Sequence, residues 1–299
     1  MDICVFGAGS LGSLIGGVLA SEHDVTLVGR QPHIERIEAN GLRITGEFER
    51  TVRPVARTDV PPEADLAVVT VKSFDTQSAA RELASMDLAG VLSLQNGMGN
   101  EELLAKQLSC PVLAGTCTYG ARLVEPGTVE CTGLGELVLG PREGGESVLG
   151  VRVGDAFGET ALEVTVSAEM PRRLWEKLAV NAGINATTAL ARVPNGALVG
   201  GPAESVTREA ARETARTARE QGVALSIEET VEQTLAVAKA TARNDSSMRQ
   251  DIEAGNRTEI DAINGYVLDA AEKAVPVNET LTRLVRAWET AQGLRKRNS

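Results

Sequence analysis

In the first half of the chain, short apolar runs alternate with segments long enough to form helices. Strands separated by helix-length connections are typical of a parallel sheet with crossover helices. These strands are expected at residues 3–6, 25–28, 66–71, 90–94 and 112–114. Later strands are expected at residues 123–129, 136–139 and 163–166, with turn signals at Pro126-Gly127 and Gly140-Pro141. A helix is expected at residues 150–157. The pattern predicts an α/β domain of the Rossmann type over residues 1–168.

From residue 169 onward the pattern changes to long segments rich in Ala, Glu, Arg and Leu, with few β-branched clusters. Such composition and spacing favour helices. Helices are predicted at residues 172–190, 204–221, 227–242, 257–274 and 279–292. The second domain, residues 169–299, should therefore be all-α.

The composition of the chain argues against three classes of partner: nucleic acids, metal ions and membranes. A net charge of -11 argues against a nucleic-acid partner, because such proteins neutralise phosphates with clustered Lys and Arg. The four cysteines form no C-x-x-C pair and there are only two histidines, so no metal site is expected. No apolar run reaches membrane-spanning length and no leader pattern precedes the first strand, which predicts a cytoplasmic protein without a membrane partner.

A glycine motif follows the first predicted strand directly. It reads Gly7-Ala8-Gly9-Ser10-Leu11-Gly12 and opens a helix. Between a strand and its helix, this spacing brings bare backbone N–H groups and the positive helix end to a pyrophosphate. A plain tight turn would explain one glycine but not three. The motif predicts binding of a nicotinamide dinucleotide.

The residue after the second strand bears on which dinucleotide binds. An enzyme that uses NAD usually carries Asp or Glu there, to hold the ribose 2'-hydroxyl. Here Gly29 and Arg30 stand instead, and a guanidinium suits a 2'-phosphate. NADP(H) is favoured, whereas NAD(H) stays open if Arg30 only ends the strand.

Two polar residues follow later strands of the sheet. Lys72 and Asn96 both fall at the carboxyl edge, where ligands bind in open α/β sheets. Lys72 could reach cofactor phosphate or ribose, and Asn96 the nicotinamide and substrate. The alternative for Asn96-Gly97 is an ordinary turn.

The first helix of the second domain carries a polar row. Lys177, Asn181 and Asn185 are spaced by four, so they share one helix face beside an apolar stripe. Asn is a poor helix former, and two within an apolar helix suggest a site rather than a solvated surface. Because neither tyrosine has a lysine four residues later, a short-chain reductase is excluded and Lys177 is the candidate proton donor.

Ser247 and Glu259 are ambiguous from their spacing alone. A serine at a helix start is most often an N-cap, and a glutamate in a first turn most often compensates the helix dipole. Glu259 and Ile263 should share a face of the helix predicted at residues 257–274.

Taken in order, these segments resemble the ketopantoate reductase (2-dehydropantoate 2-reductase) family over nearly the whole chain. The resemblance rests on the glycine motif, Val71-Lys72-Ser73, Gln95-Asn96-Gly97-Met98-Gly99, Trp175-Glu176-Lys177-Leu178, Pro194-Asn195-Gly196, Ser246-Ser247-Met248 and Thr258-Glu259-Ile260-Asp261. It implies a Rossmann-type domain followed by a helical domain like the C-terminal domain of 6-phosphogluconate dehydrogenase. Tyr119-Gly120-Ala121 departs from the small residues or histidine of many members.

The resemblance also implies residue roles. Lys177 would be the general acid and Glu259 the second active-site residue, near substrate and cofactor, which replaces the structural interpretation of Glu259 and Ser247. Asn96 and Ala121 would contact cofactor, with Asn96 also near the substrate. The substrate would be held by Asn181, Asn185, Asn195 and Ser247. The implied reaction is reduction of 2-dehydropantoate to (R)-pantoate by NADPH.

Two other functions stay open at this point. One is a related reductase of another 2-oxo acid, which would keep Lys177 and Glu259 and change the residues around the substrate. The other is a protein that senses NADPH without chemistry, against which the intact polar set speaks. If the protein is either of the two reductases, its partner is a small 2-oxo acid. A homodimer is compatible with the sequence.

Overall fold

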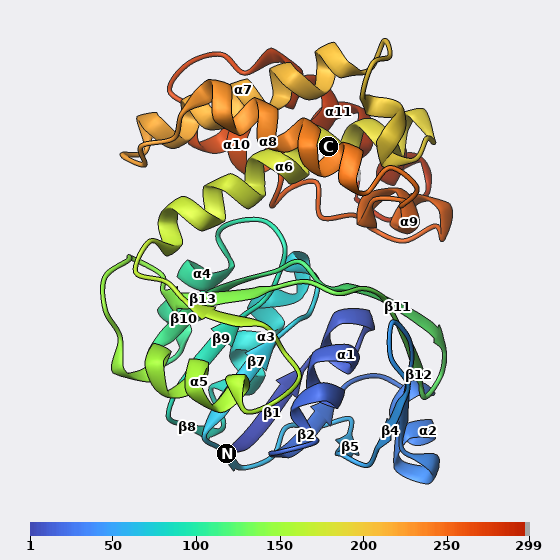
Figure 1. Cartoon of the computed structure of the whole chain (residues 1–299), viewed down its shortest axis with the longest axis vertical. Coiled ribbons are helices and arrows are strands. Elements are labelled where there is room, and N and C mark those ends of the chain that lie inside the picture. The colour runs from blue at the N-terminus through green and yellow to red at the C-terminus, as the bar shows by residue number, and fades with distance from the viewer. Residues whose placement is uncertain (297–299) are drawn as a thin grey trace. The chain divides into compact units, whose positions relative to one another are not determined.

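An eight-stranded sheet lies at the centre of the N-terminal part of the computed structural model, which describes residues 1–296 (Figure 1). Its strand order is β14-β13-β10-β9-β7-β1-β2-β5. The strands are β1 (Asp2–Phe6), β2 (Asp24–Val28), β5 (Val55–Arg57), β7 (Leu66–Val69), β9 (Val91–Ser93), β10 (Val112–Cys117), β13 (Leu137–Pro141) and β14 (Val164–Val166). Neighbouring strands are parallel except β10 and β13, so the α/β prediction is confirmed with one antiparallel step.

Alternation along the strands divides the core between the two faces of this sheet. Ile3 and Val5 face one side, in one apolar cluster with α1 and α5, whereas Cys4 and Phe6 belong to the cluster with α3 and α4. The helices are α1 (Ser10–Leu19), α2 (His33–Asn40), α3 (Thr76–Leu83), α4 (Asn100–Gln107) and α5 (Val148–Gly158). Because both faces are covered, the central strands read as continuous apolar runs rather than alternating ones.

A smaller sheet of order β11-β12-β3-β4 packs beside α1, and most of it was not predicted. Its strands are β3 (Leu42–Gly46), β4 (Arg50–Val52), β11 (Gly120–Glu125) and β12 (Thr128–Gly133). The turn expected at Pro126-Gly127 is present, and it divides the strand expected at residues 123–129 into the hairpin β11–β12. Two short strands, β6 (Glu63–Ala64) and β8 (Asp87–Leu88), pair separately.

The chain divides into two units. The first contains residues 1–95 and 100–170, and the second contains residues 96–99 together with the chain from residue 171 onward. The second unit is helical (Figure 1). Its helices are α6 (Met170–Ala191), α7 (Glu204–Glu220), α8 (Ile227–Ala240), α9 (Ser247–Glu253), α10 (Asn264–Ala270) and α11 (Pro276–Ala291), with a 3-10 turn at Asn195–Leu198. The first residue of α6, Met170, still belongs to the first unit. Within residues 1–296, no helix has the length and apolar character needed to cross a membrane.

The helix predicted at residues 257–274 is wrong over its first part. The structure ends α9 at Glu253 and starts α10 only at Asn264. Between them, the backbone N–H and hydroxyl of Thr258 both donate to Glu289 Oε1, at 2.8 and 2.7 Å. Because Thr258 is held by this buried carboxyl of α11, Glu259 lies in an irregular segment and shares no helix face with Ile263.

A buried polar network fixes the helices around α6. Glu213 of α7 accepts from the backbone N–H groups of Val277 and Asn278, at 3.0 and 2.9 Å, and so caps α11, whose own N-cap residue offers no side-chain bond. The Asn264 amide then donates to Asn278 Oδ1 and to Ala182 O of α6, at 2.9 and 3.0 Å. Because Glu213, Asn264 and Asn278 are fully buried, the network specifies one arrangement of α6, α7, α10 and α11.

Glu213→Ala should destabilise the protein by about 2–4 kcal/mol, because it leaves the N–H groups at the start of α11 buried without an acceptor. The free energy of unfolding in urea measures this. Glu209→Ala, on the exposed side of the same helix, is the control and should change it by less than about 0.5 kcal/mol. Equal effects of the two substitutions would contradict the capping role.

Candidate functional site

The glycine motif makes a tight turn between β1 and α1, against the end of β7. Gly7 has φ +114°, and a Cβ there would lie 2.7 Å from Val71 N. A Cβ at Gly12 would lie 2.3 Å from Gly7 O, so neither position accepts a side chain. A Cβ on Gly9 would meet nothing nearer than 3.9 Å, which leaves its surface open.

The open surface at Gly9 is the N-terminus of α1, a ten-residue helix without a side-chain cap. Its first N–H groups have no partner inside the helix, and the helix dipole makes this end positive. A backbone cradle of this kind fits a dinucleotide pyrophosphate. The predicted residues Gly7, Ala8, Gly9, Ser10, Leu11 and Gly12 thus lie together in the β1–α1 turn and the first turn of α1.

Arg30 lies at the end of β2, next to this cradle. The preceding Gly29 packs so closely that a Cβ there would lie 2.9 Å from Ala8 Cβ. The Arg30 side chain is 89% exposed, and its Nη2 lies 3.1 Å from Asp75 Oδ2. Sequence reasoning missed Asp75, which lies 45 residues away and belongs to the turn that follows Lys72.

The hairpin β11–β12, which carries Ala121, is fastened to α1. Leu123 N donates to Ser10 Oγ at 3.0 Å. Gly127 N donates to Nδ1 of the buried His33 at 2.9 Å, so the neutral ring donates from Nε2 to Ser13 Oγ, also at 2.9 Å. Burial lowers the pKa of His33, which keeps the ring in this neutral form. The structure thus places Ala121 beside the glycine motif.

The loop that carries Asn96 is anchored at both ends by one buried hydroxyl. Gln95 Nε2 donates to Thr76 Oγ1 at 2.7 Å, and Thr76 Oγ1 lies 2.8 Å from Asn100 Oδ1. Residues 96–99 themselves pack on the second unit, where Met98 N donates to Ala262 O at 2.9 Å. Gly97 has φ +82°, and a Cβ there would lie 2.5 Å from Ala262, so this turn requires glycine.

This loop brings Asn96 to Glu259, two predicted residues that are 163 positions apart. Asn96 Nδ2 lies 3.5 Å from Glu259 Oε2, a long and weak hydrogen bond. Glu259 is 5% exposed. Asn96 and Glu259 therefore lie side by side within the second unit.

The polar row on α6 is present as predicted. Lys177 and Asn181 are half-buried and Asn185 is 5% exposed. Within residues 1–296, neither the Asn181 nor the Asn185 side-chain amide has a hydrogen-bond partner. Because these amides have no protein partner in this part of the chain, they are suited to bind a ligand.

Asn195 and Ser247 behave differently from each other. Asn195 is buried, its Nδ2 donates to Thr241 Oγ1 at 2.9 Å, and its Oδ1 is buried without a partner. Ser247 is exposed and is the first residue of α9. The N-cap of this helix is the preceding residue, Ser246, whose hydroxyl accepts from Arg249 N. The Ser246 hydroxyl also lies 2.7 Å from Thr188 Oγ1 of α6, which links α9 to the helix of the polar row.

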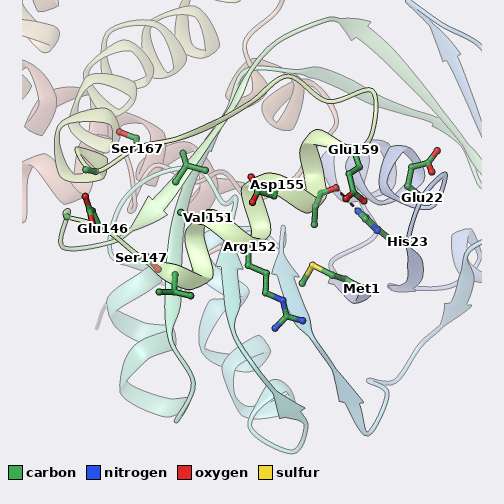
Figure 2. A pocket seen from close by; sticks show the side chains of 15 residues that line it. Met1, Glu22, His23, Glu146, Ser147, Val151, Arg152, Asp155, Glu159 and Ser167 are labelled. Carbon is green, nitrogen blue, oxygen red and sulfur yellow. Dashed lines mark hydrogen bonds between the residues drawn. The ribbon is translucent and has the colours of Figure 1, made fainter.

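One cavity in the first unit lies away from the glycine motif. It has a volume of about 1100 Å³ and is lined by α5 together with Met1, Glu22 and His23 (Figure 2). Glu22 and His23 follow the C-terminal end of α1, about 15 Å from the glycine motif at its other end. The cavity therefore contains none of the predicted site residues. Among residues 1–296, no group of His, Cys, Asp and Glu could hold a metal ion.

Comparison with known proteins gives a consistent result along the chain. The family model described as "Ketopantoate reductase PanE/ApbA" matches residues 3–144, and "Ketopantoate reductase PanE/ApbA C terminal" matches residues 169–289. A 2-dehydropantoate 2-reductase of Halobacterium salinarum is 47% identical, covering 96% of this chain and 98% of that protein. One from Archaeoglobus fulgidus is 38% identical, covering 96% and 97%.

Two solved structures are also similar. A PanE/ApbA family ketopantoate reductase from Ralstonia eutropha has TM-score 0.90 and 35% identity, covering 98% of this chain and 100% of that one. The ternary structure of D-mandelate dehydrogenase with NADH and anilino(oxo)acetate has TM-score 0.91 and 26% identity, covering 99% and 100%.

A buried carboxyl follows the loop that carries Asn96. Glu101, in the first turn of α4, is 2% exposed, and its Oε1 has no hydrogen-bond partner. Burial raises the pKa of this carboxyl to about 7, against opposing hydrogen bonds from its own backbone and from Ser93. The native state therefore holds a proton that the unfolded chain releases near pH 4.5.

Because the native pKa of Glu101 is the higher one, its stabilising effect is complete below about pH 4.5 and is lost as the pH rises through about 7. Glu101→Gln should remove this loss, so its stability relative to the unsubstituted protein should rise by about 3 kcal/mol between about pH 5 and about pH 8. Urea unfolding at both pH values measures the change. Glu82→Gln, exposed on α3, is the control, and a pH-independent effect of Glu101→Gln would contradict the assignment.

Proposed function

The chain belongs to the ketopantoate reductase family, and on that premise we propose that it reduces 2-dehydropantoate to (R)-pantoate with NADPH, a step toward pantothenate and coenzyme A. The observation that carries the proposal is the polar row on α6. It offers one amine, Lys177, and two amides that have no hydrogen-bond partner within residues 1–296. A carbonyl with polar groups on neighbouring carbons is a ligand of matching chemistry.

The residues of the first unit suit the dinucleotide. The glycine motif would hold the pyrophosphate through backbone N–H groups, in the space that a Cβ on Gly9 would otherwise enter. Arg30 would take the 2'-phosphate, and Lys72 and Ala121 would contact the phosphates and ribose. Bound NADPH supplies the hydride for the C2 carbonyl. The choice of NADPH over NADH rests on Arg30 and on the lack of a carboxylate directly after β2.

Lys177 is the proposed general acid. Its ammonium donates a hydrogen bond to the C2 carbonyl oxygen and stabilises the negative charge that develops there, and then transfers a proton to form the hydroxyl. Asn181 and Asn185 orient the substrate from the same helix face without adding charge. Asn195 and Ser247 would hold its distal part.

Glu259 and Asn96 complete the set. Their side chains lie next to each other, with Asn96 Nδ2 3.5 Å from Glu259 Oε2. We assign Glu259 to a hydroxyl of the substrate and to the cofactor, and Asn96 to the nicotinamide side. The roles of residues 1–168 in cofactor binding and 169–299 in substrate binding follow from this assignment. The cytoplasmic location and the homodimer stay predictions.

A second candidate is the reduction of a different 2-oxo acid. The likeness to D-mandelate dehydrogenase, whose structure was solved with NADH and anilino(oxo)acetate, favours it. In that case Lys177 and Glu259 would keep their roles, and the residues around the side chain of the acid would select another substrate.

The first test follows oxidation of NADPH and of NADH with a panel of 2-oxo acids. 2-Dehydropantoate should give the highest kcat/KM, above 2-oxoisovalerate and phenylglyoxylate. A panel member that is reduced much faster would establish the second candidate. If the protein binds NADPH but no 2-oxo acid causes NADPH to be oxidised, the remaining function is that of an NADPH sensor.

Lys177→Ala should lower kcat by about two to four powers of ten, the usual contribution of a positioned proton donor. The dissociation constant for NADPH should stay within about twofold, because Lys177 is assigned to the substrate carbonyl. Steady-state rates and nucleotide fluorescence measure the two quantities. Lys239→Ala, exposed on α8, is the matched control. Retention of most of the activity by Lys177→Ala would refute the role.

A further inference from the structure

The cofactor-facing arginine is paired with an acidic residue from another strand end. Arg30 Nη2 and Asp75 Oδ2 lie 3.1 Å apart, between the end of β2 and the turn Ser73–Asp75 that follows β7. The glycine motif lies between these two strand ends, since Gly7 packs on Val71 and Gly29 packs on Ala8. The ion pair therefore stands where the adenosine ribose of a dinucleotide is expected.

Within residues 1–296, the Asp75 carboxylate has Arg30 as its hydrogen-bond partner. Asp75 occupies the N-cap position of α3, where Asp is common because its carboxylate accepts a backbone N–H of the first turn. Here the side chain makes no such bond. The carboxylate is directed at Arg30 instead, at the expense of the cap.

A second arginine beside β2 is neutralised in the same way. Arg57 lies opposite Val28 on the neighbouring strand β5, and its carbonyl accepts from Gly29 N at 3.2 Å. Its guanidinium is held by both carboxylate oxygens of Asp59, with Nε to Oδ1 at 3.2 Å. Both arginines at this end of the sheet thus have a carboxylate partner, and their positive charge is compensated.

This pairing acts oppositely on the two cofactors. A 2'-phosphate is close to a dianion, so on Arg30 it meets the Asp75 carboxylate as a repelling neighbour. Because the Arg30–Asp75 ion pair is exposed, breaking it costs little free energy. The larger effect on NADPH binding is the repulsion between the 2'-phosphate and the Asp75 carboxylate. A ribose 2'-hydroxyl is a hydrogen-bond donor, and a carboxylate near it is the usual feature of NAD sites.

We propose that Asp75 determines cofactor specificity: it restrains Arg30, weakens the binding of NADPH and lets the enzyme use NADH as well. The inference rests on the proposed dinucleotide-dependent function. It explains how a chain without a carboxylate directly after β2 can still present one to the ribose, from the end of β7.

The experiment measures the dissociation constants of NADPH and NADH by nucleotide fluorescence, without substrate, and kcat/KM with each cofactor. Asp75→Asn keeps the shape and removes the charge. It should raise the NADPH-to-NADH affinity ratio by about tenfold at low salt, and by less at high salt, where exposed charges are screened. Thermal unfolding checks that the variant is folded.

Two further variants separate the cause. Asp59→Asn removes a carboxylate from the neighbouring Arg57 and should change the ratio by less than about twofold. In the double variant Arg30→Ala with Asp75→Asn, the gain in NADPH affinity should be mostly lost, because it depends on the released guanidinium.

Three results would overturn the inference: an unchanged ratio in Asp75→Asn, a shift toward NADH, or an equal shift in Asp59→Asn. If the unsubstituted protein binds both nucleotides but reduces no 2-oxo acid, the proposed function fails while the binding ratio still decides the role of Asp75. If it binds neither nucleotide, both are overturned.

Discussion

The close approach of the β1–α1 turn to the end of β7 is the constraint on which the first unit depends. A Cβ at Gly7 would overlap the backbone of Val71, and a Cβ at Gly12 would overlap Gly7. Thr70 supports the same contact, because its hydroxyl donates to Gly7 O at 2.8 Å. This packing exposes the N–H groups of α1 and sets the distance between the ends of β2 and β7. The pairing of Arg30 with Asp75 follows from that distance.

In the second unit, hydrogen bonds between buried polar groups position the helices. Aromatic residues make up only 3% of the chain, and small alanines fill much of the helical core. Such a core offers little shape specificity, whereas a network that leaves no donor unsatisfied allows few arrangements. Glu213, Asn264 and Asn278 join α7, α10 and α11 to Ala182 of α6. Glu289 holds Thr258 and thereby the segment of Glu259. The candidate site is thus fixed by bonds remote from it.

The loop at residues 96–99 is held both by close packing at a glycine and by hydrogen bonds of a buried polar group next to it. Thr76 anchors both of its flanks to the first unit, and Gly97 fits it against Ala262 of the second. Within the second unit, the glycine turn against Ala262 holds Asn96 near Glu259, although Ala262 has no chemical role of its own.

The sequence by itself determined what local spacing can encode. The glycine motif after β1, the apolar strands, the helices of the second unit and the row of Lys177, Asn181 and Asn185 all depend on residues within a few positions of each other. The pairing of β3 with β12, the irregular segment around Glu259 and the partners of Arg30 and Asn96 depend on residues 31 to 163 positions apart, so no local period could reveal them. Thr258 shows the physical reason. Its N–H and hydroxyl donate to a buried carboxyl on α11, 31 positions away, and only the folded chain brings that carboxyl there.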